Sequence, residues 1–264
     1  MNDTKNQPKE HVIKGQTTFR PDHKNTLWYD QPATLSGVSD PWMEYSLPLG
    51  NGQLGASLFG GVRRDQVLFN EKTLWTGGIG ISDYRADYGD GVIYGCYQVF
   101  GALYAECLDD FGDTAASPIQ GYVRTLDLDE GVGTVRYTSP DGAVNYLREY
   151  FVSYPDNAII IRYSADKKKR INLRFSMESG KPGVVATTSY TNGCGRFNGK
   201  LNTISYAAEF RVVPKGGTLQ TEAEGITVKG ADEVVVVLAA QTDYDAYSPT
   251  YVSHTSELVN RTSA

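Results

Sequence analysis

Short apolar segments with the composition of β-strands recur along the second half of the chain and constrain its fold more than any other feature. Segments 158–163, 171–177, 201–213, 226–228 and 233–240 are rich in Val, Ile, Tyr, Phe and Thr, and turns containing Gly, Asn or Lys separate them. Short strands at regular intervals are typical of sandwiches and barrels. The 264 residues are enough for one large domain of this kind. The sequence therefore predicts an all-β fold.

Two segments have the pattern of β-hairpins. Between residues 47 and 69, apolar side chains alternate with others on both sides of Gly60-Gly61. Segments 133–138 and 144–153 flank Ser139-Pro140-Asp141-Gly142, in which Pro fixes φ and Gly supplies a positive φ. We therefore expect one hairpin in each place.

Two further segments carry less regular signals. The run Val234-Val235-Val236-Val237-Leu238 is apolar at successive positions, which predicts a strand buried on both faces. Near residues 93–108 we expect one helical turn.

The chain ends differ in composition from its middle. Residues 1–26 are polar, contain Pro8 and Pro21 and show no steady period, so we expect a disordered lead-in. Residues 248–264 resemble the start of a linker. No composition shift divides the middle, which predicts one domain over residues 27–247.

Charge and hydropathy exclude two classes of partner. The net charge is -6, and Lys and Arg are scattered instead of forming a basic stripe, so we expect no nucleic acid partner. The longest basic run, Lys167-Lys168-Lys169-Arg170, falls in a predicted turn, where solvated charge is the ordinary interpretation. No apolar run is long enough to span a bilayer, so we expect no membrane partner. The first residues lack the apolar stretch of a secretory signal, but this leaves the localisation unknown.

Cysteine and histidine are too few and too dispersed for a common metal or redox site. The three cysteines have wide spacings, and the three histidines lie near the two ends. We expect no metal and no cofactor.

Aromatic and amide side chains are densest over residues 28–78. Sugar-binding clefts use such residues, because an aromatic face covers the C–H side of a pyranose while amides and carboxylates bind its hydroxyl groups. The structural alternative is that the tryptophans fill the core or an interface and that the asparagines hold turns. The candidate site residues are Trp42, Glu44, Asn51, Asn70, Glu71 and Trp75.

The same stretch resembles the opening of glycoside hydrolase family 95, the α-L-fucosidase family. The motifs LWYDQPA, W-x-E followed by LPLGNGQLGA, FGG and NEKTLWTGG occur in the order and spacing of that family. The similarity continues through YQVFGALY, YVRTLDLDEGVGTVRYTSPDG, LREYFVSYPDNAIIIRYSA and VKGADEVVVVLAAQTDY, and covers about residues 27–247. YQVFGAL departs from the more usual YQPLGDL, and the helical insert that usually precedes it is reduced to a short stretch.

The resemblance implies a fold and a place in a larger enzyme. In such enzymes this region is a large two-sheet antiparallel β-sandwich of the supersandwich type, as in galactose mutarotase-like domains. A helical linker and a catalytic (α/α)6 barrel follow it, and we expect this chain to stop where that linker starts. The parent is then expected to cleave terminal α-L-fucosyl or related α-L-galactosyl linkages, with no catalytic residue in this chain. The six candidates would pack against the barrel or rim its pocket.

Two other functions stay open at this point. In the first, the domain is a stand-alone carbohydrate-binding module for fucosylated glycans. In the second, it is a complete small glycosidase that uses Glu44 and Glu71. Family members are commonly exported, which implies a periplasmic or secreted parent.

Overall fold

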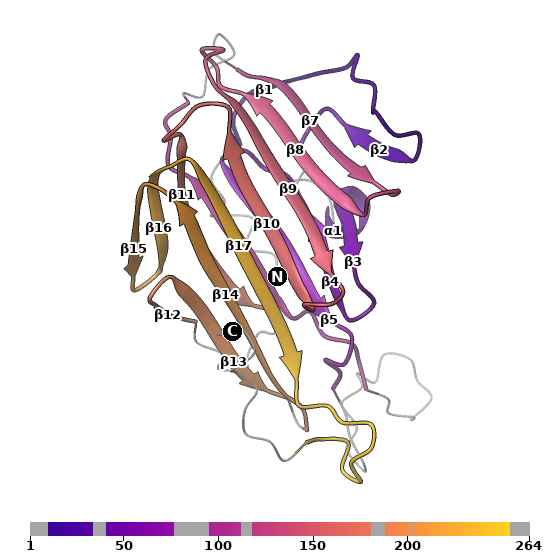
Figure 1. Cartoon of the computed structure of the whole chain (residues 1–264). Coiled ribbons are helices and arrows are strands. Elements are labelled where there is room, and N and C mark those ends of the chain that lie inside the picture. Colours follow the sequence, from indigo (N-terminus) through magenta and orange to yellow (C-terminus); the bar gives the residue numbers. More distant parts are fainter. Residues whose placement is uncertain are drawn as a thin grey trace.

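The computed structural model describes residues 10–33, 41–76, 95–111, 118–180, 188–201 and 203–253. Two sheets, both rich in antiparallel pairs, pack face to face and do not close into a barrel (Figure 1). The predicted all-β, two-sheet sandwich is confirmed. The described part of the chain has no helix with the length and apolarity that a membrane crossing requires.

The larger sheet has ten strands in the order β1-β7-β8-β9-β10-β17-β14-β13-β12, and β2 also pairs with β7. All of its pairs are antiparallel except that of β1 with β7. Its strands are β1 (Ile13–Gly15), β2 (Thr26–Tyr29), β7 (Ile119–Asp127), β8 (Val132–Thr138), β9 (Asn145–Ser153), β10 (Ala158–Ala165), β12 (Ser189–Thr191), β13 (Cys194–Lys200), β14 (Ser205–Lys215) and β17 (Glu233–Thr242).

The smaller sheet has seven strands in the order β15-β16-β11-β6-β5-β4-β3. They are β3 (Leu47–Gly50), β4 (Leu54–Leu58), β5 (Arg64–Glu71), β6 (Gly101–Cys107), β11 (Ile171–Ser179), β15 (Thr218–Glu222) and β16 (Gly225–Ala231). The short helix α1 (Pro41–Tyr45) precedes β3.

Both predicted hairpins are confirmed. The prediction of a helical turn near residues 93–108 is wrong. β4 pairs with β5 and β8 pairs with β9, as predicted, and Gly142 has a φ of 73° in the second turn. Residues 101–107 form β6 instead of helix. β6 lies between β5 and β11, and its first five residues are buried, so its apolar side chains show no period of two.

The valine-rich strand β17 is buried on one face only. Val234, Val236 and Leu238 are enclosed, while Val235 and Val237 are half-buried on the outer face of the larger sheet. The prediction of burial on both faces is therefore wrong, because the strand preference of Val also fills outward positions.

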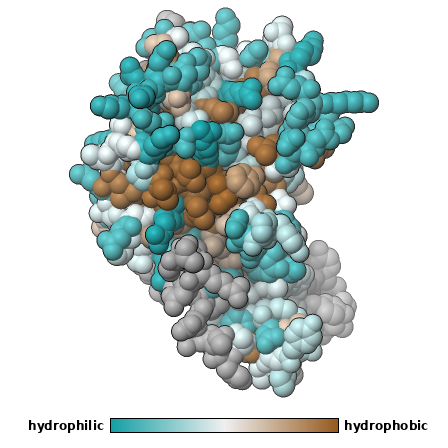
Figure 2. Space-filling view, viewed as in Figure 1, coloured by the Kyte–Doolittle hydropathy of each residue, from teal (hydrophilic) through white to brown (hydrophobic). Residues whose placement is uncertain are grey.

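Neighbouring strands extend this outer apolar surface. Figure 2 shows an apolar belt across the sheet, with hydrophilic residues above it. Ile160, Phe151 and Val213 belong to it together with the outer valines of β17, because their strands pair at these positions.

The expected lead-in is part of the sandwich. β1 pairs with β7, and the Glu10 carboxylate accepts hydrogen bonds from the backbone N–H groups of Val62 and Arg63, both at 2.8 Å. The prediction of disorder is wrong for residues 10–26. A strand of three residues is too short to show a period in the sequence, and the contacts of one carboxylate leave no sequence pattern. Residues 1–9 and 254–264 lie outside the described residues, and the linker stays a prediction.

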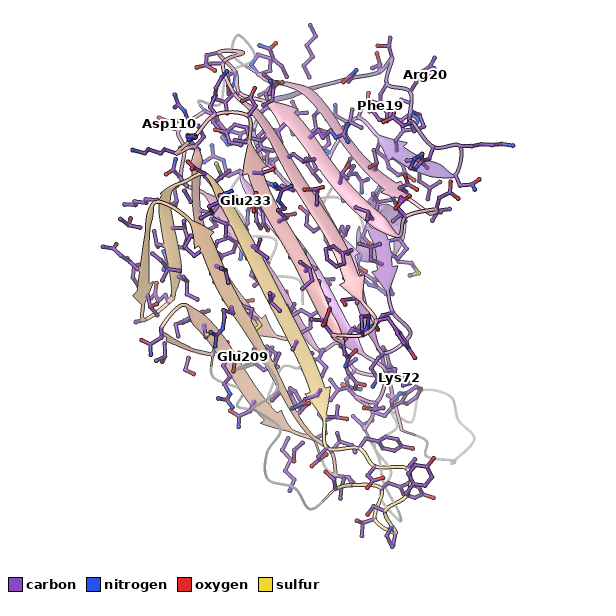
Figure 3. All side chains as sticks on the ribbon, in the orientation of Figure 1. Phe19, Arg20, Lys72, Asp110, Glu209 and Glu233 are labelled. Carbon is purple, nitrogen blue, oxygen red and sulfur yellow. The ribbon has the colours of Figure 1, made fainter. Side chains whose placement is uncertain are left out.

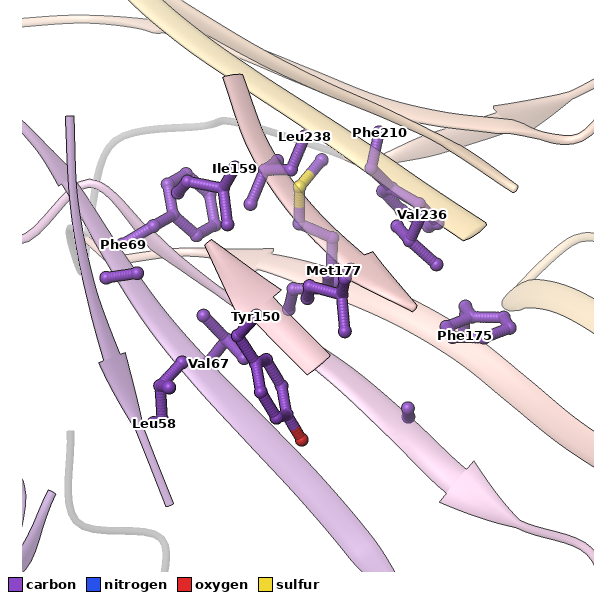
Figure 4. Close-up of a cluster of buried hydrophobic side chains, with 14 of the residues drawn as sticks. Leu58, Val67, Phe69, Tyr150, Ile159, Phe175, Met177, Phe210, Val236 and Leu238 are labelled. Atoms are coloured by element: carbon purple, nitrogen blue, oxygen red, sulfur yellow. The ribbon is translucent and has the colours of Figure 1, made fainter. Parts of the chain in front are cut away.

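The core lies between the two sheets (Figure 4). Phe69 of β5 stacks on Phe197 of β13 at 6.4 Å between ring centroids. Leu58 and Val67 of the smaller sheet lie in the same buried cluster as Ile159 of the larger. This apolar burial supplies most of the free energy that stabilises the sandwich.

One buried ion pair joins the sheets within this core. The Asp65 carboxylate of β5 lies 3.6 Å from the Arg148 guanidinium of β9, and both side chains are almost fully enclosed. Tyr150 donates to Asp65 at 2.5 Å, and Arg148 donates to the carbonyl of Gly61 at 2.5 Å. Burial raises the pKa of Asp65, an effect that the Arg148 charge opposes. The pair is thus held by hydrogen bonds from both sheets.

Replacing Arg148 with Met should lower the free energy of unfolding by about 3–5 kcal/mol, because it leaves the buried Asp65 carboxylate without its cation. Urea unfolding measures the loss. Arg162→Met is the matched control, since Arg162 is a partly exposed surface arginine that pairs with two glutamates, and its loss should cost about 1 kcal/mol or less. Equal losses in the two variants would show that the buried ion pair contributes no more to the free energy of unfolding than a surface ion pair does.

Candidate functional site

Asn51 holds the turn between β3 and β4. Its side-chain oxygen accepts the backbone N–H groups of Gln53 at 2.9 Å and Leu54 at 2.7 Å. Its amide nitrogen donates to the carbonyl of Ser153 at 2.8 Å, which ties the turn to the end of β9. All three contacts are structural, as expected of an asparagine in a turn.

Glu71 is an enclosed carboxylate at the end of β5. Its side chain accepts hydrogen bonds from the backbone N–H of Thr73 at 2.9 Å, from the Thr73 hydroxyl at 2.5 Å and from the amide of Gln53. Burial raises the pKa of Glu71, while these hydrogen bonds act in the opposite direction. Through Gln53, the Asn51 turn and Glu71 form one connected unit.

Trp75 follows this unit directly and is partly exposed. Its indole N–H donates to the carbonyl of Lys72 at 3.0 Å, and its ring lies 5.5 Å from that of Tyr97. Trp75 is 47% exposed and Tyr97 44%. Burial raises the pKa of Tyr97, and the nearby Glu71 charge adds to the effect. An aromatic pair with free surface therefore stands beside the buried carboxylate.

Asn70 fixes the segment that carries Tyr97. The side-chain oxygen of Asn70 accepts the backbone N–H of Phe100 at 2.9 Å. Gln98 N–H donates to the carbonyl of Leu74 at 3.0 Å, so this segment is held along its length. The two aromatic rings are therefore mounted on a rigid base.

Further aromatic side chains gather at the same end of the sandwich. The Thr73 hydroxyl contacts that of Thr242 at the end of β17, and the chain then continues into Tyr244. Tyr244 stacks on Tyr251 at 6.5 Å with an interplanar angle of 5°. We call this surface the aromatic end, and it lies at the bottom of Figure 1. Its exposed members are Trp75, Tyr97, Tyr244, Tyr247 and Tyr251.

Trp42 and Glu44 lie elsewhere. Both are on α1, at the opposite end of β3 from the Asn51 turn, and both are exposed, Trp42 by 49%. Arg124 holds the end of α1, because it donates to the carbonyl of Tyr45 at 2.6 Å. The structure thus divides the six predicted residues into two groups, with Asn51, Asn70, Glu71 and Trp75 in one and Trp42 and Glu44 in the other.

Glu44 and Glu71 do not have the arrangement of a glycosidase pair. Such a pair flanks the scissile bond, so both carboxylates must reach the sugar. Glu71 is 1% exposed and its oxygens accept hydrogen bonds from the protein, whereas Glu44 lies on the surface of α1. The Asn51, Asn70 and Glu71 contacts instead position the aromatic pair.

Several members of this group were not selected from the sequence. Gln53, Thr73 and Tyr97 all lie within the quoted motifs, so the motifs themselves were the available signal. Their grouping depends on the register of β4 with β5 and on the return of the chain after residue 95.

A separate polar cluster joins residues that are distant in sequence. His23, Asp127 and Asp129 bring their ligand atoms within 4.8 Å of one another. The hydrogen bond that His23 donates to the Asp127 carboxylate raises the pKa of the exposed His23. Asp127 also accepts the N–H groups of Asp129 and Glu130, so turn geometry and one ion pair account for the cluster.

The sequence of this chain matches the profile of a known protein family. The profile of the family described as "Glycosyl hydrolase family 65, N-terminal domain" matches residues 27–89 and 81–247. This chain belongs to that family. The expected resemblance to the amino-terminal domain of an α-L-fucosidase-like glycoside hydrolase is confirmed, and the matching profile carries the family number 65.

Curated relatives of this glycoside hydrolase domain include named fucosidases. "Probable alpha-fucosidase A" of Aspergillus niger is 29% identical over 84% of this chain and 31% of its own length. "Alpha-L-fucosidase 2" of Arabidopsis thaliana is 31% identical over 55% of this chain and 20% of its own length. "Probable alpha-fucosidase A" of Aspergillus oryzae is 20% identical over 84% of this chain and 34% of its length. The matches thus span about a third or less of each relative.

Glu71→Ala should lower the free energy of unfolding by about 1–3 kcal/mol, because it leaves the donors of Gln53 and Thr73 without their acceptor. Glu44→Ala is the matched control, since an exposed surface carboxylate should cost about 0.5 kcal/mol or less. Chemical unfolding followed by tryptophan fluorescence measures both. Equal stabilities would mean that Glu71 does not organise its surroundings.

Glu71 should also contribute a pH-dependent part to stability. Its folded pKa is raised above the ordinary value of 4.5, so the folded state binds a proton more tightly than the unfolded state does. This contribution is present below the ordinary pKa and is lost as the pH rises through the folded pKa. Relative to Glu71→Gln, the native chain should therefore lose stability from about pH 4.5 upward. Urea unfolding across a pH series measures the difference, and a constant difference would contradict it.

Proposed function

We propose that this chain is the amino-terminal, non-catalytic domain of a family 95 α-L-fucosidase-like glycoside hydrolase. Its parent cleaves terminal α-L-fucosyl or related α-L-galactosyl linkages, and the domain packs against a catalytic (α/α)6 barrel of the same polypeptide. The names of the curated relatives and the order of the amino-terminal motifs support this proposal. Export of the parent to the periplasm or the exterior is part of the same proposal.

The observation that carries the proposal is the aromatic end. Trp75 and Tyr97 keep nearly half of their surface exposed, and Tyr247 is 98% exposed. Contiguous exposed aromatic surface marks interaction sites, because leaving it in water is unfavourable. The Glu71 unit fixes the two rings before any partner arrives, which lowers the entropic cost of docking. We assign the aromatic end to the barrel interface and the rim of its pocket.

The first test compares hydrolysis of 4-nitrophenyl α-L-fucoside and 2'-fucosyllactose by this chain and by a longer polypeptide that joins it to its catalytic portion. Activity is expected in the longer polypeptide alone. Turnover by the isolated chain at a comparable rate would contradict a non-catalytic role.

In the longer polypeptide, Trp75→Ala should weaken domain docking or substrate affinity, because it removes the largest ring of the aromatic end. The expected result is a KM raised about fivefold or more, or an earlier separate unfolding transition of this domain. Phe151→Ala, which removes an exposed ring from the outer face of the larger sheet, is the control and should change neither. If Trp75→Ala changed neither the KM nor the unfolding of this domain, the assignment of the aromatic end to the interface would be wrong.

Exposed aromatic rings also favour a second function, a stand-alone carbohydrate-binding module. The Trp75 and Tyr97 rings have the free faces on which a pyranose stacks. Calorimetric titration of the isolated chain with fucosylated and galactosylated oligosaccharides separates the two functions. Millimolar or tighter binding that Trp75→Ala abolishes supports the module, and absence of binding supports the architectural role.

A further inference from the structure

A hollow of about 750 Å³ lies on the outer face of the larger sheet, at the opposite end of β17 from the aromatic end. Leu147 of β9 and Ser164 of β10 are paired neighbours in its lining. The short Ser164 lines the hollow together with longer side chains, among them Arg162 and Lys168. Glu233, labelled in Figure 3, lines it from β17.

Cationic side chains outnumber carboxylates around this hollow. Five of its lining residues are Arg or Lys and three are Asp or Glu, in a chain whose net charge is -6. The cations come from β8, β10, β14 and the turn after β10, and they are Arg136, Arg162, Lys167, Lys168 and Lys215. The fold therefore concentrates positive charge that the sequence disperses.

Two of the carboxylates are already engaged by neighbouring backbone. Asp166 accepts hydrogen bonds from the backbone and side-chain N–H groups of Asn145 at 3.0 and 2.8 Å. Asp232 accepts the backbone N–H of Lys169 at 2.8 Å. Their acceptor capacity is thus partly used within the protein.

The third carboxylate belongs to an ion-pair row that crosses three strands. Arg162 donates to Glu149 and to Glu233, both at 2.5 Å, so this cation is neutralised. Arg136 and Lys168 differ, because no ion pair joins either of them to another residue that the structure describes. Both are exposed and both line the hollow, whereas Lys167 and Lys215 interact electrostatically with Asp166 and Glu233, so Arg136 and Lys168 supply the uncommitted positive charge.

We infer that this hollow binds an acidic oligosaccharide, a short glycan that carries carboxylate or sulfate groups. The inference rests on the proposed function, since it assigns the domain to a glycan-degrading enzyme. The volume lies within the range of roughly 300–1,000 Å³ that is usual for small-molecule sites. Arg136 and Lys168 would bind the acidic groups, and the exposed amide of Gln16 would bind a sugar hydroxyl, while Thr138 and Asn145 are held by hydrogen bonds to each other and to Asp166.

The local shape of the site distinguishes a short glycan from a nucleic acid. A polyanion needs a basic stripe that follows its backbone, whereas these cations surround one hollow and carboxylates lie among them. The adjoining surface is the apolar belt of β10, β14 and β17, in which Arg211 of β14 lies beside Val237, so apolar side chains separate the hollow from the next cation along the sheet (Figure 2).

The test is calorimetric titration of the chain with trigalacturonic acid, sulfated maltotriose and neutral maltotriose, with a short single-stranded oligothymidylate as a polyanion comparison. At least one acidic trisaccharide should bind, and its affinity should fall as salt is added. Arg136→Gln combined with Lys168→Gln should weaken that binding by about fivefold to tenfold, because two exposed charge contacts are lost. Lys229→Gln, an exposed lysine of β16 in the other sheet, should leave it unchanged.

The outcomes separate clearly. Binding of trigalacturonic acid identifies a carboxylated ligand, and binding of sulfated maltotriose alone identifies a sulfated one. Absence of acidic binding, equal binding of neutral maltotriose, equal or tighter binding of the oligothymidylate, or unchanged affinity in the double variant would each overturn the inference. All variants should keep the native unfolding midpoint, since the altered side chains are exposed. Fucoside hydrolysis by the longer polypeptide tests the proposed function separately, so failure of one is distinguishable from failure of the other.

Discussion

The buried pairing of Asp65 with Arg148 is the constraint on which the placement of β5 depends. A charge in the core needs its partner and hydrogen bonds, so the start of β5 cannot slide along β9 without leaving both ions unsatisfied. A register slip would also turn Phe69 out of the core. Because the start of β5 is fixed in this way, its other end delivers Asn70 and Glu71 to one position. The strand that carries the buried ion pair at its start thus carries, at its other end, two residues that position the aromatic pair.

The two ends of the sandwich and its outer face carry different chemistry for a common reason. Within a strand, side chains alternate between core and surface, so each strand that fills the core also presents an outward row. On the larger sheet these rows produce the apolar belt and, next to it, the row that joins Glu149, Arg162 and Glu233. At the aromatic end the strands stop, and turn residues such as Asn51 satisfy the backbone in their place.

The fold class and two hairpins could be predicted from the sequence because strand composition and turn chemistry are local. The strand β6 could not, since its successive buried residues carry no alternation, and neither could β1, which is three residues long. The motifs identified the candidate site residues, but they could not show which of these residues lie close together in the fold. Trp42 and Trp75 are equally exposed in the same dense stretch, yet they lie on different parts of the surface because β3 and the Asn51 turn separate them.

The clustering of cationic side chains around the hollow could not be predicted from the sequence. Arg136, Lys168 and Lys215 are far apart in the chain and look like ordinary solvated residues, and the net charge argues against any anionic partner. Pairing of β8 with β9, of β9 with β10 and of β17 with β14 places them around one hollow. Electrostatic interactions between exposed groups fade beyond roughly 8–10 Å at physiological salt, so the local excess decides binding and the net charge does not. A negatively charged domain is therefore able to present a site for a negatively charged sugar.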